Sequence, residues 1–475
     1  MLHDAQKSAL VRQKNEPSWS QLELTPPDYR EQRDDRRLLV WGDLPHWMVV
    51  DHEFDELLAQ FHGHSDTVAH TLAGLSATER NAITSQLVEL HRIGVLREAG
   101  DGQSGNPKQN DAPTRIENIS VNLTRRCNLR CSFCYYLEDL GVRCDDELTA
   151  REIIAFLKAA RPLLAAKPSL ALLGGEPTLC SDKLLEVARY ALKAGFTLLL
   201  STNGTMITPE FAAAARRMRL QVQVSLDDYE AAGHDAGRGA GTFARALDGI
   251  KTLVAANVHT ILSMVCHAEN LERVEGYYAF ARSIGVNEAR FIPLKRIGGA
   301  KQTGPEPAPV CEIIARTVRM LERHPEYLSL MGRDCFSILG STCRLASRRR
   351  SCGVGSQTVL LDADGALYPC LNTNREQFRI GNIRDPGFDF PELWRGSTVL
   401  HDVREQTDID RSDEACSRCF VRYWCLGNCR GETHALTHRL SGPSHACRDM
   451  RRAWLDMMWI TAEHPEWIVT TQTAC

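Results

Sequence analysis

Hydrophobic residues from position 115 onward recur with the spacing of alternating strands and helices. Short apolar runs predict strands at 116–123, 170–173, 197–201, 221–226, 260–266 and 289–294. Segments of helical periodicity predict helices between them, near 149–164, 182–194, 209–219, 242–256 and 271–284. Six such β–α units in series predict an α/β fold, a barrel of parallel strands closed or partly closed over residues 115–295. The functional site of such a barrel lies at the carboxyl ends of its strands.

A smaller unit is predicted over residues 36–98. Two strand-like apolar runs, 37–41 and 46–50, precede a helix whose apolar stripe consists of Phe54, Leu57, Leu58 and Phe61. A second helix starts at Ser76, which is placed to form a capping box with Glu79, and a strand-like segment follows it. Strands, then helices, then a strand are the pattern of a small winged-helix domain.

The remaining segments carry weaker periodicity. Residues 1–35 are polar and are predicted to form a flexible arm, and residues 99–114 are rich in Gly, Asn, Asp and Pro, as linkers are. Residues 296–342 are predicted to bridge the barrel to a cysteine-rich domain over 343–450. A helical tail is expected over 451–475.

Composition narrows the class of protein. The chain has 475 residues and a net charge of −4, so no global basic field indicates nucleic-acid binding. The second predicted helix carries mixed charge, which disfavours DNA as its ligand. No apolar run is long enough to cross a membrane, and the amino terminus lacks the apolar segment of a secretory signal. We therefore expect a cytoplasmic protein with neither a membrane nor a nucleic acid as partner.

Cysteine is unusually abundant. The 17 cysteines are an odd number and no export signal accompanies them, so tight clusters of them favour metal binding over a disulfide framework. Cys127, Cys131 and Cys134 follow the first barrel strand, and three thiolates on one loop can hold three irons of a [4Fe–4S] cube. The fourth iron is then open to a small molecule. Zinc is the alternative, but it needs a fourth ligand, and Cys144 is irregularly spaced.

Phe133, before the third cysteine, completes a motif that resembles the radical S-adenosylmethionine (SAM) enzymes. Four further motifs that match this family follow the expected strands or the loop after them. The resemblance implies that the GGEP element receives the SAM amino group, that two motifs contact the ribose and methionine, and that an arginine pairs with the SAM carboxylate. The matching SAM-contact positions are Phe133, Gly174, Gly175, Glu176, Ser201, Asn203, Ser225, Asp227 and Arg238.

Seven further cysteines, between 352 and 447, follow a second pattern that resembles the SPASM domain, which holds two auxiliary [4Fe–4S] clusters. A hairpin turning at 363–365 is predicted to bring the first two together. The resemblance assigns auxiliary cluster I to Cys352, Cys370 and Cys429, completed by Cys343, with Cys335 as the competitor or an open iron instead. It assigns auxiliary cluster II to Cys416, Cys419, Cys425 and Cys447. Zinc ribbons remain the alternative on spacing alone.

The resemblance implies a definite chemistry with three [4Fe–4S] clusters and SAM as cofactors. An electron from a flavodoxin- or ferredoxin-type donor reduces the first cluster. SAM is then cleaved, and the resulting 5′-deoxyadenosyl radical abstracts hydrogen from the substrate. The auxiliary clusters accept electrons, which suits oxidative crosslinking of a peptide. Asp408 and Asp410, before Cys416, are the candidates for the base, with a solvated loop as the alternative interpretation.

The winged-helix unit is similar in layout to elements that bind the leader of a ribosomally made peptide as an added strand. The chain therefore resembles SPASM maturases that modify a peptide or small protein subunit. The expected reaction is thioether formation from Cys to carbon. Its layout is similar to the maturase type that builds Cys-to-Asp/Glu thioethers in the small subunit of quinohemoprotein amine dehydrogenase. The alternatives are an anaerobic sulfatase-maturing enzyme, which forms formylglycine, and a non-catalytic zinc-binding recognition protein.

Overall fold

The computed structural model describes residues 18–62, 67–99, 115–142, 144–302, 304–331 and 349–467. Its largest element is a nine-stranded sheet in the order β11-β10-β9-β8-β7-β6-β12-β13-β14. Strands β6 to β11 run parallel to one another, and β6 and β11 are not paired in the part described, so the predicted α/β core is confirmed as a partial barrel. The core strands are β6 (Ile116–Asn122), β7 (Leu164–Leu173), β8 (Thr197–Thr202), β9 (Gln221–Ser225), β10 (Thr260–Cys266) and β11 (Glu288–Pro293).

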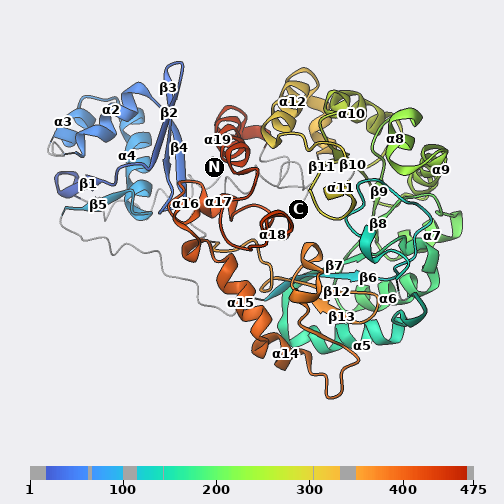
Figure 1. Ribbon diagram of the computed structural model, residues 1–475. Helices are drawn as coiled ribbons and strands as arrows, with labels where there is room; N and C mark the ends of the chain where they lie inside the picture. The colour runs from blue at the N-terminus through green and yellow to red at the C-terminus, as the bar shows by residue number, and fades with distance from the viewer. Residues whose placement is uncertain are drawn as a thin grey trace.

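Helices cover the outer face of this sheet (Figure 1). Apart from α8, each packs an apolar stripe on the strands, as α5 does with Ile153, Phe156 and Leu157. The core helices are α5 (Ala150–Ala160), α6 (Ser181–Lys193), α7 (Pro209–Arg217), α8 (Ala231–Arg238), α9 (Thr242–Ala255) and α10 (Val274–Ser283). Helix α8 was not predicted, because Gly233 and Gly237 give its sequence the composition of a loop.

The C-terminal region extends the core sheet. Strand β12 (Thr358–Leu361) pairs in parallel with β6 and in antiparallel with β13 (Ala366–Tyr368), so the predicted hairpin is confirmed. Gly365 has φ +89°, which favours glycine at its turn. The other C-terminal elements are α11 (Gly299–Gln302), α12 (Val310–Arg323), β14 (Gly381–Asn382), α14 (Phe390–Gly396), α15 (Thr398–Thr407), α16 (Glu414–Ser417), α17 (Arg422–Cys425), α18 (Arg430–Thr437) and α19 (Cys447–Glu463).

The part of the N-terminal domain that the structure describes has two small sheets, β2-β3-β4 and β1-β5, with three α-helices. Ser76 and Glu79 form the predicted capping box. The prediction of a flexible arm over residues 1–35 is wrong from residue 18 onward, because Leu22 and Leu24 are buried in a strand that pairs with β5. The elements are β1 (Leu22–Leu24), β2 (Tyr29–Arg33), β3 (Arg36–Trp41), β4 (His46–Asp51), α2 (His52–Gln60), α3 (Val68–Ala73), α4 (Ala77–Arg92) and β5 (Leu96–Glu98).

Both faces of the three-stranded sheet are buried, and this joins the N-terminal domain to the C-terminal helices. Leu39 and Trp41 face the domain's own helices, whereas Leu38 and Val40 pack in a cluster that includes Trp459 of α19. The continuous apolar run of β3 follows from this arrangement, since a strand covered on both sides needs no polar alternation. Figure 1 shows the N-terminal domain beside α16, α17 and α19.

Polar contacts strengthen this contact between domains. Glu31 accepts hydrogen bonds from Arg452 at 2.8 and 3.0 Å and from the Trp459 indole at 3.0 Å. Burial opposes ionisation of Glu31, but the hydrogen bond from Arg452 outweighs it and, with other partners, lowers its pKa to about 2. Tyr29 stacks on Phe420 with 4.4 Å between ring centroids. The two domains are therefore packed as one unit.

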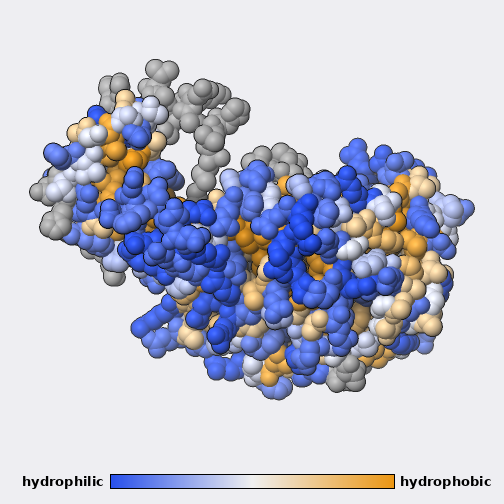
Figure 2. Space-filling model, turned by 90° about the horizontal axis from the view of Figure 1, so that it is seen from above, coloured by the Kyte–Doolittle hydropathy of each residue, from blue (hydrophilic) through white to orange (hydrophobic). Residues whose placement is uncertain are grey.

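The surface is mostly polar. In Figure 2 the hydrophilic colour covers most of the visible face, with apolar colour in smaller areas. The large apolar side chains found exposed in the structure are Val142, Leu179 and Met206, each in the connection that follows a core strand. None of the helices described is both long and apolar enough to cross a membrane.

Candidate active site at the carboxyl ends of the core strands

The first cysteine group lies on the loop that leaves β6. Arg130 donates to the carbonyls of Cys127 and Leu129 at 2.9 and 2.8 Å, and the Cys134 amide donates to the Cys131 carbonyl at 3.2 Å. These contacts fold the loop back on itself. Its three cysteines are half-buried free thiols, so the structure brings them together on one tight loop.

The loop suits a metal cluster chemically. Burial raises the pKa of all three thiols, that of Cys134 to about 11, so a thiolate there needs a compensating positive charge. A coordinated metal supplies that charge. The Leu129 amide lies 3.4 Å from the Cys127 sulfur and Arg238 lies 3.9 Å from the Cys131 sulfur, and both donors stabilise thiolates. The residues present therefore fit the cluster.

The GGEP segment runs alongside the start of this loop. Gly175 and Glu176 donate their amides to the carbonyls of Thr124 and Arg126, both at 2.8 Å. A Cβ on Gly175 would lie 2.2 Å from the Arg126 carbonyl oxygen, and a Cβ on Gly174 would lie 2.5 Å from that of Thr124. Only glycine permits this close approach of the two backbones.

Glu176 ties the ends of β7 and β8 together. Its buried carboxylate accepts hydrogen bonds from Thr178, from the Thr202 hydroxyl at 2.7 Å and from the Asn203 amide at 2.8 Å. The Asn203 side chain in turn donates to Asn128 of the cysteine loop at 2.8 Å. Glu176 and Asn203 therefore lie beside the cysteines as expected, and their contact with SAM stays a prediction.

Arg238 ends α8 and forms a buried ion pair with Asp227. The guanidinium also lies 5.4 Å from the Phe133 ring centroid, so Phe133, Asp227 and Arg238 meet next to Cys131. The predicted contact of Arg238 with the SAM carboxylate stays a prediction. The two serines of the predicted set, Ser201 and Ser225, are half-buried at the ends of β8 and β9.

A buried polar network, which sequence reasoning missed, joins the cysteine loop to the β12–β13 hairpin. Asp362 accepts hydrogen bonds from Tyr136 at 2.6 Å and from Asn122 at 2.7 Å, and it pairs with Arg125. Arg125 also pairs with Asp364 at 2.9 Å. Arg125 lies two residues before Cys127, and Tyr136 lies two residues after Cys134. Both ends of the cysteine motif are therefore fixed to the C-terminal domain.

The predicted ligands of auxiliary cluster I lie near the end of β11. The negative charge of Cys429 raises the pKa of Lys295, against the effect of burial. The charges of Cys370 and Cys352 raise the same pKa further. The Asn372 amide lies 3.4 Å from the Cys429 sulfur. The structure thus brings these three cysteines together. The proposed fourth ligand, Cys343, and its competitor, Cys335, lie outside the described residues.

The predicted ligands of auxiliary cluster II lie around α16, α17 and the start of α19. Burial raises the pKa of Cys425 to about 11, and the nearby charges of Cys419 and Cys447 add to this rise. Cys447 also adds to the raised pKa of Cys416. The structure therefore places these four thiols next to one another.

Asp408 and Asp410, the predicted base candidates, are held in ion pairs. Both pair with Arg350. The Asp408 side chain also caps a short helical turn by accepting a hydrogen bond from the Asp410 amide. Asp410 also accepts a hydrogen bond from Tyr423 at 2.7 Å. Neither lines the pocket described next, and their role as a base stays a prediction.

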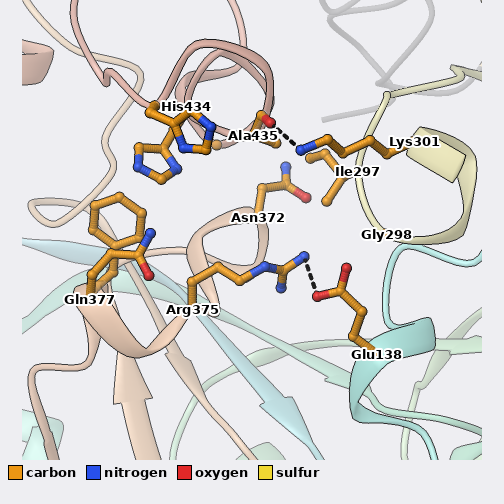
Figure 3. Close-up of a pocket in the computed structure, with 12 residues that line it drawn as sticks. Glu138, Ile297, Gly298, Lys301, Asn372, Arg375, Gln377, His434 and Ala435 are labelled. Carbon is orange, nitrogen blue, oxygen red and sulfur yellow. Dashed lines mark hydrogen bonds and ion pairs between the residues drawn. The ribbon is translucent and has the colours of Figure 1, made fainter.

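A pocket with an empty volume of about 590 Å³ lies between the cysteine loop, the α11 region and the C-terminal domain. Figure 3 shows Arg375 and Glu138 pointing toward one another across it, 3.4 Å apart, and Lys301 reaching the Ala435 carbonyl. Burial, and then positive neighbours including Arg375 and Lys301, lower the pKa of His434. Asn372 lines this pocket and contacts Cys429, which links the pocket to the auxiliary I cysteines.

Zinc and a [4Fe–4S] cube place different geometric demands on their ligands. Within the described ranges, no three His, Cys, Asp or Glu side chains converge on a site for one metal ion. A structural zinc needs four ligands at about 2.0–2.3 Å from a single ion. A [4Fe–4S] cube binds each thiolate at a different iron, so its ligands need not converge on one point.

Comparison with known proteins agrees with this geometry. Residues 121–281 match the radical SAM superfamily and residues 352–420 match the iron-sulfur cluster-binding domain SPASM. The mycofactocin maturase MftC of Mycobacterium ulcerans is 30% identical over 334 residues, which are 69% of this chain and 87% of that protein. The AdoMet-dependent heme synthase of Methanosarcina barkeri is 28% identical, over 67% of this chain and 92% of that protein.

Solved structures give the same fold. The structure of anSMEcpe with bound AdoMet matches with a TM-score of 0.60 and 17% identity, over 75% of this chain and 99% of that one. Streptococcus suis SuiB bound to its precursor peptide SuiA matches with a TM-score of 0.57 and 12% identity, over 90% of this chain and 100% of that one. The chain therefore belongs to the radical SAM superfamily and carries a SPASM domain. It is an enzyme whose cofactors are [4Fe–4S] clusters and SAM.

Proposed function

We propose that this enzyme modifies a ribosomally made peptide or small protein subunit, most directly by closing thioether crosslinks from Cys to carbon. The observation that carries the proposal is the N-terminal domain, packed against the SPASM helices. The match to SuiB covers 90% of the chain, more than the residues after 114 can supply, so it reaches into this domain. SuiB binds a precursor peptide and MftC is a maturase, and both support a peptide substrate.

The sheet of the N-terminal domain offers an edge for a leader peptide. Its order β2-β3-β4 leaves β2 and β4 with one partner strand each among the described residues. Because both faces of this sheet are covered, its edges are where an extended peptide can add as a strand. We therefore assign leader binding to this sheet.

The pocket is our candidate for the site that receives the modified segment. Lys301 and Arg375 contribute two cations against the single carboxylate of Glu138, as Figure 3 shows, so its charge favours an acidic segment. Asn372 connects the pocket to Cys429 of the auxiliary I set. An acidic segment next to a Cys is the substrate that a Cys-to-Asp/Glu thioether requires.

The same proposal assigns the cofactors to residues of this site. Cys127, Cys131 and Cys134 would hold the first cluster, and the loop ends near Glu176, Asn203 and Asp227 would surround SAM. When bound, these groups supply a radical that removes a hydrogen atom from the substrate, and the auxiliary clusters supply an acceptor for the electron released on crosslinking. The protein orients the peptide and takes up the thiol proton. The flavodoxin- or ferredoxin-type electron donor stays a prediction.

Asp139 is a stronger base candidate than either carboxylate chosen from the sequence. Burial, and next the charge of Asp362, raise its pKa to about 6. A base with a pKa slightly below the working pH is deprotonated yet still accepts protons well. Asp139 does not itself line the pocket, but it accepts a hydrogen bond from Asn374 at 2.9 Å and directly follows Glu138, which does. Sequence reasoning missed it, since nothing local shows that this carboxylate is half-buried.

We expect peptide crosslinking to rise with pH through about 6 and then level off, because Asp139 is protonated and inactive below that value. Asp139→Asn is expected to abolish this rise of the rate with pH and to slow crosslinking by about 10²–10⁴-fold. Asp408→Asn is the matched control and is expected to retain the wild-type pH profile. If Asp408→Asn loses activity and Asp139→Asn does not, the base is the one the sequence indicated.

The function itself is tested with the peptide encoded by the short cysteine-rich reading frame nearest this gene. Reduced, SAM-supplied enzyme is expected to remove two hydrogen atoms per crosslink, seen by mass spectrometry with fragmentation that locates each Cys–carbon bond. Hydrogen exchange on the mixture is expected to protect β2 or β4. Conversion of a Cys or Ser to formylglycine, with no protection of these strands, would instead support the sulfatase-maturing alternative.

A further inference from the structure

Arg430 is one of the largest fully buried side chains of the protein. It follows Cys429 directly as the first residue of α18, and 2% of its surface is exposed. Burying a guanidinium costs several kcal/mol unless an anion or a set of hydrogen bonds compensates. A charge buried so completely therefore needs a compensating partner.

The protein groups around Arg430 do not supply that partner. One terminal nitrogen donates to the Gly442 carbonyl at 2.8 Å. The other terminal nitrogen and Nε are buried, and neither has a hydrogen-bond partner among the described residues. No carboxylate of the described ranges forms an ion pair with Arg430. Two of its donor nitrogens are thus left for something other than the polypeptide.

The local backbone is shaped around this guanidinium. Gly427 has φ +74°, and a Cβ placed on it would lie 1.8 Å from an Arg430 nitrogen. Gly427 stands between Cys425 and Cys429, so the short segment joining the two cluster sets leaves room for the arginine. The position of Arg430 is therefore built into the cysteine motif.

The charge of Arg430 reaches thiols of both auxiliary sets. The guanidinium lies against Gly427, two residues after Cys425 and two before Cys429. Cys425 is expected to bind auxiliary cluster II and Cys429 auxiliary cluster I. Burial raises the pKa of Cys416, also of the auxiliary II set, and the charge of Arg430 opposes that rise. Arg430 is thus a cation between the two sets.

We propose that Arg430 is the shared countercharge of the two auxiliary clusters and that it sets both of their reduction potentials. Each cluster gains one negative charge on reduction, and a fixed cation at low effective dielectric favours that reduced form. The unpaired donors also suit the cluster sulfurs as acceptors. The inference rests on the ligand sets expected for the SPASM domain and needs no peptide substrate.

The test is a redox titration of the reconstituted full-length enzyme, followed by electron paramagnetic resonance without peptide. In Arg430→Gln we expect both auxiliary potentials to fall. At a fixed potential the ratio of reduced to oxidised cluster should drop at least tenfold, which is about 59 mV for a one-electron couple. The potential of the Cys127–Cys134 cluster should not change. Arg430→Lys, which keeps the charge, should retain most of both potentials.

Arg418→Gln is the matched control, because it removes the same charge between Cys416 and Cys419 from a side chain that is 79% exposed. Water screens that charge, so its loss should leave the potentials unchanged. If Arg430→Gln loses its iron, Arg430→Met decides, because it keeps a long side chain without the charge, and both potentials should fall in it. Auxiliary potentials that are unchanged in the iron-replete Arg430→Gln or Arg430→Met variant overturn the proposal.

Discussion

Cys131→Ala is expected to abolish reductive cleavage of SAM while leaving most of the bound iron in place. Cys131 is one of three thiols on the loop after β6, and a [4Fe–4S] cube that loses one of three thiolates is not retained. Three cubes correspond to about 12 irons per chain, so the variant should retain about 8. Anaerobic iron analysis and detection of 5′-deoxyadenosine after dithionite treatment measure both effects.

Cys180→Ala is the control for this experiment. Cys180 is also a half-buried thiol near the site, but its sulfur donates to the Pro177 carbonyl at 3.3 Å and belongs to neither cysteine pattern. It should keep its full iron content and SAM cleavage. Zinc in place of iron in the wild-type protein, or SAM cleavage by Cys131→Ala, would contradict the assignment of this loop.

Asp362→Ala is expected to lower the stability of the core by about 3–5 kcal/mol, the cost of breaking a buried ion pair from one side. Asp362 is 2% exposed, and its removal leaves Arg125, Tyr136 and Asn122 without their shared acceptor. The variant should also lose iron from the cysteine loop, because Arg125 and Tyr136 flank that loop. Chemical unfolding monitored by tryptophan fluorescence, with iron analysis, measures both consequences.

Asp146→Ala provides the comparison for a surface ion pair. Asp146 pairs with Arg384 at 2.6 Å but is 72% exposed, so its loss should cost less than about 1 kcal/mol and no iron. Equal effects of the two substitutions would show that the buried network does not hold the loop.

The fold was largely predictable because its signals are local. Each core strand is an apolar run and each core helix but one carries a stripe of helical period, and both can be read within a few residues. The Ser76–Glu79 capping box is equally local. The two missed elements have different causes. Strand β1 is stabilised by pairing with β5, far along the chain, whereas α8 has two glycines that weaken its local helical signal.

The site likewise has features that the local sequence predicts and features that depend on distant contacts. Cysteine spacing predicts which thiols gather, because ligands of one cluster must lie on short loops or turns. The network of Asp362 joins residues 237 positions apart in sequence, as its pair with Arg125 shows, and no local pattern encodes that contact. Asp408 and Asp410 were chosen for their place before Cys416. Their pairing with Arg350, 58 residues before Asp408, decides their environment in the folded protein.

The sheet that buries Leu38 and Val40 against α19 also fixes a distance. A peptide anchored on that sheet and reacting in the pocket must bridge a constant span, since the two regions are parts of one packed body. Under the proposed function, we expect the number of residues between the anchor and the reacting Cys to select which Cys is used. Lengthening that spacer should move the crosslink along the peptide rather than merely slow it.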